Sequence, residues 1–251
     1  VVAASHVAKA DPDGYTISHE SSTVFMVNTY LRKNLSFVTT RDFVPVIGLI
    51  RTNDVFLAKV ALPVNSVNDV VALAQKKPGE LNYGSFGVGS ASHFDGAKFS
   101  LATGIKMTHI PYKGGTNVMK ALLAGDVDVA FTGLTAALPL IRQGRLKALA
   151  WGADKRSTSI PDVPTLKELG FDFDTGGWMG WFVPTGTPAA VVQRISTDAG
   201  KLFSNPAFVE KSVTRFGLET LNTPAREMGK LMADTHAKYK KLFSAVKIDV
   251  N

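Results

Sequence analysis

Short apolar runs alternate along the chain with longer amphipathic stretches, in which apolar residues recur every three or four positions. The longer stretches predict helices and the short runs predict strands. The predicted strands are "GYTISHE", "VPVIGLI", "VFLAKV", "LNYGSF", "MTHIPY", "VDVAFTG" and "KALAWG". This alternation is typical of βα units around a mostly parallel sheet, so the sequence predicts an α/β fold.

Several helix starts are marked by capping residues. Ser66 is followed three positions later by Asp69, which is the pattern of a capping box, and Pro78-Gly79 ends the helix that follows. The pairs Thr187-Pro188 and Thr223-Pro224 predict an N-cap and a first-turn proline for two long amphipathic helices.

Two apolar segments, 55–63 ("VFLAKVALP") and 180–188 ("GWFVPTGTP"), share one plan, in which a strand runs into a proline-bearing turn and then a helix. We interpret them as two hinge strands. Residues 64–179 then form one lobe, and residues 1–54 with 189–251 form the other. A small ligand is expected in the cleft between such lobes.

Composition narrows the classes of partner. The formal charge is +7, but only "HAKYKKLF" and "AQKKPG" are locally basic and neither is interleaved with aromatic residues, so no nucleic-acid binding is expected. The longest apolar stretches fall well short of the roughly 20 residues that span a bilayer. There is no cysteine among the 251 residues, which excludes disulfides and thiolate chemistry.

The stretch "GVGSASHF" follows a predicted strand and precedes a predicted helix. Neither Ser85 nor Ser90 has the flanking glycine pair of a nucleophile elbow, and Ser92 stands where a dinucleotide fingerprint needs its third glycine. Two interpretations remain open for this bend. The helix N-terminus binds an anion through its backbone N–H groups, or a serine merely caps the helix.

Catalysis and metal binding have less support from the residues. His93 lies three positions after Ser90, but no acidic residue can be assigned as the orienting carboxylate of a serine hydrolase. Such a hydrolase stays an alternative of a different class. The histidines have none of the spacings typical of metal sites; they are His6, His19, His93, His109 and His236.

A second strand-to-helix bend lies in "HIPYKGGTNVMKALLAGDVDVAFTG". The strand ends at Tyr112, Lys113-Gly114-Gly115 forms the bend, and Thr116 is a candidate cap. In a parallel sheet both bends fall beside each other at the carboxyl edge, where α/β proteins bind ligands. Lys113 then supplies positive charge to the site; a solvated turn lysine is the alternative.

Taken together, six blocks of the chain resemble the Bug-type extracytoplasmic solute receptors, the binding proteins of tripartite tricarboxylate transporters. They occur in the family's order over essentially the whole chain. The blocks are "ADPDGYTI", "KKPGELNYGSFGVGSASHF", "IPYKGGTNVMKALLAGDVDVAF", "IRQGRLKALAW", "SIPDVPTLKELGF" and "VPTGTPAAVV".

The resemblance implies a type II periplasmic-binding-protein fold with two α/β lobes, two crossover strands and closure on a carboxylate. With the bends described above, it gives a set of candidate ligand-binding residues. They are Ser21, Ser22, Thr23, Gly89, Ser90, Ala91, Ser92, His93, Tyr112, Lys113, Gly114, Thr116, Thr132 and Gly133. We expect no catalytic residue, metal or cofactor.

The chain departs from the family at its start. It opens with "VVAASHVAKADPDGYT", which resembles the end of the second βα unit, so the family's first strand and ligand loop have no counterpart here. We favour missing sequence over a homologue that has lost half of its site. The residues that recognise one end of the ligand then lie outside this sequence.

The sequence thus predicts a monomeric periplasmic receptor, made with a signal peptide, that presents a small carboxylate to a membrane permease. An amino acid, a di- or tricarboxylate and an aromatic acid all fit such a site. The alternative is a cytosolic effector-binding module of a transcription regulator, which has a similar two-lobed fold.

Overall fold

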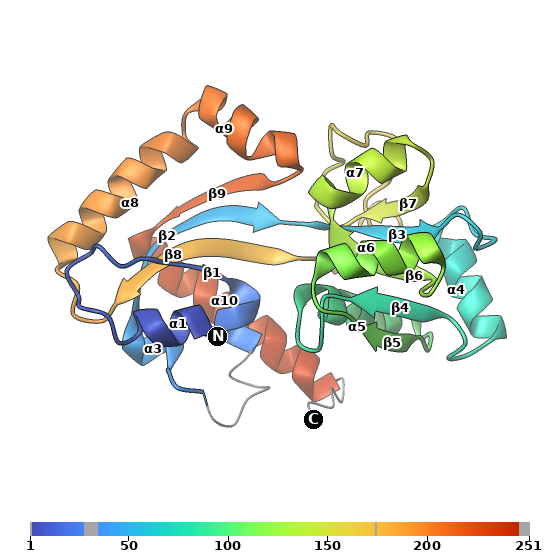
Figure 1. Ribbon diagram of the computed structural model, residues 1–251, viewed down its shortest axis with the longest axis horizontal. Helices are drawn as coiled ribbons and strands as arrows, with labels where there is room; N and C mark the ends of the chain where they lie inside the picture. Colours follow the sequence, from blue (N-terminus) through green and yellow to red (C-terminus); the bar gives the residue numbers. More distant parts are fainter. Residues whose placement is uncertain (1, 28–34, 174, 246–251) are drawn as a thin grey trace. The chain divides into compact units, whose positions relative to one another are not determined.

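The computed structural model describes residues 2–27, 35–173 and 175–245. The chain forms two compact units (Figure 1): unit 1 comprises residues 1–51 and 177–251, and unit 2 comprises residues 52–176.

These boundaries differ from the expected ones by a few residues. Residues 52–54 belong to unit 2, and residues 177–179 belong to unit 1. The reason is strand pairing, because the strand from Asp54 joins the sheet of unit 2 and the strand from Gly177 joins the sheet of unit 1. The two segments interpreted as hinge strands are therefore each part of one sheet, and their role as hinges stays a prediction.

Unit 2 is built on a five-stranded sheet with the order β5-β4-β6-β3-β7. Its elements are β3 Asp54–Lys59, α4 Val67–Lys76, β4 Asn82–Ser85, α5 Ala91–Thr103, β5 Thr108–Pro111, α6 Gly115–Ala124, β6 Val129–Gly133, α7 Leu134–Arg142 and β7 Leu146–Trp151. β4 runs parallel to β5 and β6, as expected, whereas β3 runs antiparallel to both β6 and β7. The sheet is mixed rather than mostly parallel.

Both faces of the unit 2 sheet are buried, which explains its nearly continuous apolar strands. Phe56 and Phe131 stack with ring centroids 4.5 Å apart on the face covered by α4 and α5. Leu57 and Trp151 lie on the other face, with α6 and α7 (Figure 1). Alternate residues of β3 thus enter separate core clusters, as the period of a strand requires.

Unit 1 has a four-stranded sheet with the order β1-β8-β2-β9. Its elements are α1 Val2–Val7, β1 Ser18–Ser21, η1 Thr23–Val27, α3 Thr39–Asp42, β2 Phe43–Thr52, β8 Gly177–Pro184, α8 Ala189–Phe203, α9 Pro206–Ser212, η2 Thr214–Phe216, β9 Glu219–Pro224 and α10 Ala225–Ala245. Both β1 with β8 and β2 with β9 pair antiparallel.

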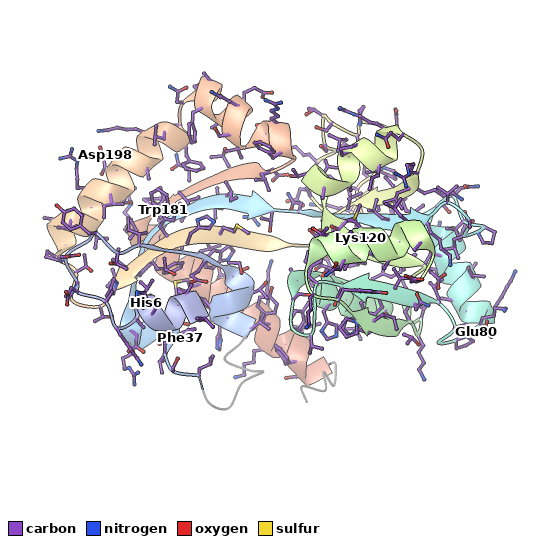
Figure 2. All side chains as sticks on the ribbon, viewed as in Figure 1. His6, Phe37, Glu80, Lys120, Trp181 and Asp198 are labelled. Carbon is purple, nitrogen blue, oxygen red and sulfur yellow. The ribbon has the colours of Figure 1, made fainter. Side chains whose placement is uncertain are left out.

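An aromatic cluster forms part of the unit 1 core. The rings of Phe25 and Phe182 lie 4.4 Å apart, and those of Phe37 and Phe43 lie 5.6 Å apart. Figure 2 labels Phe37 beside the helices at the start of the chain. Because Phe25, Phe37 and Phe43 belong to the N-terminal segment and Phe182 to β8, the cluster joins that segment to β8.

The predicted caps have mixed outcomes. The capping box of Ser66 and Asp69 at α4 is confirmed. Thr187 is not an N-cap, because its hydroxyl donates to the carbonyl of Pro184 at 2.8 Å and Pro188 precedes the helix. Pro224 likewise ends β9 instead of entering the first turn of α10.

Candidate functional site

The two strand-to-helix bends of unit 2 lie side by side. The N–H of Tyr112 donates to the carbonyl of Ser85 at 2.9 Å, and the N–H of Gly114 donates to the carbonyl of Phe86 at 3.3 Å. This contact extends the parallel pairing of β4 and β5 beyond the strand ends. The adjacency expected from a parallel sheet is therefore present.

Two glycines give the first bend its shape. Gly87 has φ +125° and Gly89 has φ +77°, both in the region that disfavours a side chain. A Cβ atom at Gly87 would also lie 3.3 Å from the carbonyl oxygen of Tyr112. The close approach of the two bends thus depends on glycine at this position.

The hydroxyls of the first bend are used within the bend itself. Ser90 is the N-cap of α5 and donates to the carbonyl of Gly87 at 2.7 Å. Ser92 is fully buried and accepts from the N–H of Phe86 at 3.0 Å. These bonds shape the loop, and the contact of both serines with a ligand stays a prediction.

His93 also stabilises the first bend. Its Nδ1 accepts the N–H of Gly89 at 3.1 Å, which leaves Nε2 to carry the proton of the neutral ring. His93 is 8% exposed, and its ring stacks on that of His109 with centroids 3.8 Å apart and planes 5° apart. His93 is therefore placed to hold the loop, and its contact with a ligand stays a prediction.

Sequence reasoning missed His109, which it had considered only as a metal ligand. His109 lies opposite Tyr83 in the register of β5 and β4, and its Nε2 is 2.6 Å from the hydroxyl of Ser85. Burial lowers the pKa of His109 to about 4, and burial together with His109 lowers that of His93 to about 4. Both rings are uncharged at neutral pH. The sequence did hold one signal for this role of His109, which is its position in the predicted strand that leads into the second bend.

The helix N-termini leave uncommitted backbone donors. In the part of the chain that the structure describes, the N–H groups of Ala91 and Ser92 at the start of α5 make no hydrogen bond. The same holds for Gly115, Thr116 and Asn117 at the start of α6. Such donors, together with the helix dipoles, offer partial positive charge to an anion.

The remaining candidates in unit 2 lie around these helix starts. Lys113 is exposed, and its carbonyl accepts from the side-chain amide of Asn117 at 2.8 Å. Thr132 is buried and pairs with Val55, and Gly133 precedes α7. Because β6 is parallel to β4, these two residues end their strand at the same edge of the sheet as the bends.

Ser21, Ser22 and Thr23 belong to unit 1, where β1 passes into η1. Ser22 is buried, and its hydroxyl accepts the N–H of Trp178 at 3.3 Å. A Cβ atom at Gly177 would lie 2.4 Å from that hydroxyl oxygen, so the start of β8 needs glycine here. Within its unit this junction is fixed against the first residues of β8.

The described residues include no group of three or more His, Cys, Asp or Glu side chains placed to hold a metal ion. None of the helices in this described part of the chain has the length and apolar character of a membrane span.

Comparison with known proteins gives matches along nearly the whole chain. The model of the tripartite tricarboxylate transporter family receptor matches residues 1–248. A UPF0065 protein of Bordetella pertussis is 34% identical over 236 residues, which cover 93% of this chain and 72% of the relative.

Two solved structures resemble the protein over nearly its full length. R. palustris Rpa4515 with adipate has a TM-score of 0.90 at 29% identity, covering 97% of this chain and 81% of that one. The periplasmic binding protein BugD has a TM-score of 0.85 at 28% identity, covering 98% and 83%. The α/β fold and the Bug-type resemblance expected from the sequence are confirmed. The chain belongs to the receptor family of the tripartite tricarboxylate transporters.

Proposed function

We propose that this chain captures a small carboxylate in the periplasm and delivers it to the permease of a tripartite tricarboxylate transporter. The proposal rests on one observation above others: two adjacent helix N-termini of unit 2 present backbone N–H groups that no described protein atom uses. Family membership and the adipate in the R. palustris relative favour a carboxylate over other anions.

The chemistry of the bends suits an anion that arrives already ionised. A carboxylate offers two acceptor oxygens and fits a pair of N–H donors without requiring a proton. The neutral rings of His93 and His109 add no charge at neutral pH. Recognition then depends on peptide dipoles and the nearby Lys113, so it is expected to vary little between pH 6.5 and 8.

No bond is made or broken in this function. The hydroxyls of Ser90 and Ser92 bond within the bend, and the Nδ1 of His93 is occupied by the N–H of Gly89. Neither serine donates to the ring of His93 among the described contacts. We therefore infer that the solute leaves the receptor unchanged.

The test uses the full-length gene product and a panel of acids. Adipate, malate, citrate, glutamate and benzoate are screened by thermal shift and then by calorimetry, with adipamide as an uncharged control of matched length. At least one acid should raise Tm and bind saturably, since a ligand selective for the folded state stabilises it. A panel without any binding, or equal binding of adipamide, would contradict the proposal.

A further inference from the structure

Two buried carboxyl groups in unit 2 have no part in the site as described so far. Asp95 lies one turn into α5 and is fully buried, and Asp54 begins β3 and is 5% exposed. The Oδ2 of Asp95 accepts the N–H of Gly176 at 2.9 Å. Its Oδ1 lies 2.8 Å from the Nζ of Lys98 on the same helix.

These groups lie where the chain enters and leaves unit 2. The N–H of Asp54 donates to the hydroxyl of Thr175 at 2.9 Å, and that hydroxyl is 3.2 Å from the carbonyl of Asp54. A Cβ atom at Gly176 would lie 2.2 Å from the carbonyl oxygen of Thr52. The first and last residues of unit 2 are therefore in direct contact beside Asp95.

The packing there is too close for larger side chains. A Cβ atom at Gly152 would lie 1.7 Å from the hydroxyl oxygen of Thr175, and the N–H of Gly152 donates to the carbonyl of Asp54 at 3.0 Å. The end of β7 thus joins the same contact. Three segments distant in sequence meet at one point.

The Oδ2 of Asp54 and the Oδ1 of Asp95 are buried, and apart from the ion pair with Lys98 neither has a hydrogen-bond partner among the described residues. One proton held between the two carboxyls would remedy this lack. The ionisable groups facing the pair are Lys98 of α5 and Tyr83 of β4, whose own pKa is raised by burial and by Asp95. Burial, followed by the charge of Asp95, raises the pKa of Asp54 well above 3.8. Burial also raises the pKa of Asp95, but Lys98 and the N–H of Gly176 oppose that rise.

We propose that Asp54 and Asp95 share one proton and form a latch that ties the first turn of α5 to both ends of unit 2. Asp95 is then a positioning residue for the solute site, because the turn just before it carries the free amides of Ala91 and Ser92. This role rests on the proposed function, whereas the shared proton and the tie to Gly176 do not.

The first test concerns the proton. A carboxyl whose pKa is raised on folding stabilises the protein below its unfolded pKa, and this stability is lost as pH rises toward its folded pKa. Asp54→Asn removes that dependence and keeps an uncharged side chain of the same shape. Relative to this variant, the unfolding constant of the wild type should rise about tenfold per pH unit above pH 4.

Urea unfolding of the full-length protein between pH 4 and 7 measures the ratio of the unfolding constant of the wild type to that of Asp54→Asn. Asp154→Asn is the matched control, because Asp154 forms an exposed ion pair with Lys167 at 3.0 Å. The ratio of the wild-type unfolding constant to that of Asp154→Asn should therefore stay nearly constant over the same pH range. A constant ratio of wild type to Asp54→Asn across the range would overturn the shared proton.

The second test concerns positioning. In Asp95→Ala the N–H of Gly176 loses its acceptor, and the loop held by α5 loses its support. Amide exchange at Gly176 and Gly89 should become at least tenfold faster, while that at Phe56 in the centre of β3 stays unchanged. General destabilisation would instead speed exchange at all three positions.

Adipate binding provides the readout at the site. Affinity should fall at least tenfold in Asp95→Ala, while a wild type that binds no acid would count against the proposed function alone. If Asp95→Ala does not fold, the neutral pair Asp95→Asn with Lys98→Met replaces it. Its amide oxygen should keep the protection of Gly176, whereas adding Asp54→Asn to it should remove the pH slope that the burial of Asp54 still produces. Unchanged exchange at Gly176 in Asp95→Ala, or loss of the protection of Gly176 in Asp95→Asn with Lys98→Met, would overturn the latch.

Discussion

His93 acts on the first bend through a single ring nitrogen. Its Nδ1 fixes the N–H of Gly89, and its face rests on His109. The sequence placed His93 at the site but not its orientation, because the partners of a buried ring are set by packing. His109 and Asp95 were missed for the same reason, since their roles depend on residues of other strands.

Two replacements of His93 test how much its hydrogen bond with the N–H of Gly89 contributes to stability. His93→Ala leaves the buried N–H of Gly89 without an acceptor and should lower the unfolding free energy by about 1–3 kcal/mol. His93→Asn can supply an amide oxygen near the position of Nδ1 and should lose less. Urea unfolding at pH 7 compares the two, and equal stability of His93→Ala and wild type would contradict this role.

At the scale of elements, the site depends on where α5 and α6 begin. Ala91 is the first residue of α5, and Ser90 before it is extended, with φ −77° and ψ 162°. Proline is well tolerated at the first position of a helix after such a residue, and it removes the N–H. A single donor can thus be deleted with little change to the helix.

Ala91→Pro should weaken the binding of the best acid of the panel by about tenfold to a hundredfold, as expected for a hydrogen bond to a charged group. Ala189→Pro is the matched control, because Ala189 is the first residue of α8 in unit 1. Calorimetry gives both affinities. Equal affinities of the two variants would show that the N–H of Ala91 does not take part.

Local sequence signals predicted the helix caps only in part. The cap at Ser66 depends on contacts within four residues and is confirmed. The direction of β3 was not predicted, because it depends on pairing with β6 and β7 more than 70 residues later. The two Thr-Pro caps are equally local and were wrong, because the hydroxyl of Thr187 bonds backwards to the carbonyl of Pro184 and Pro224 ends β9.

At the scale of the whole molecule, the buried histidine pair and the buried carboxyl of Asp54 make the unfolding free energy depend on pH in opposite directions. The pKa values of His93 and His109 fall from 6.5 to about 4, so their stabilising effect is complete above pH 6.5 and is lost as pH falls toward 4. The raised pKa of Asp54 acts in the other direction, because its effect is lost as pH rises above 3.8.

With two histidines against one carboxyl, the wild-type unfolding free energy should increase from pH 4.5 to 6.5. The slope is about 1.4 kcal/mol per pH unit for each net proton. Urea unfolding gives the profile, and Asp54→Asn should steepen it. A flat or falling wild-type profile would show that the histidine pair is not held neutral in the folded protein.

The position of β3 between β6 and β7 has a consequence for synthesis on the ribosome. β4 pairs with both β5 and β6, and the three strands emerge as one continuous block, residues 82–133. β3 emerges before them but finds its second neighbour only once residue 151 is made, and Thr175 must follow to bond Asp54. A nascent chain released before that point exposes an apolar strand with one unpaired edge, which invites aggregation.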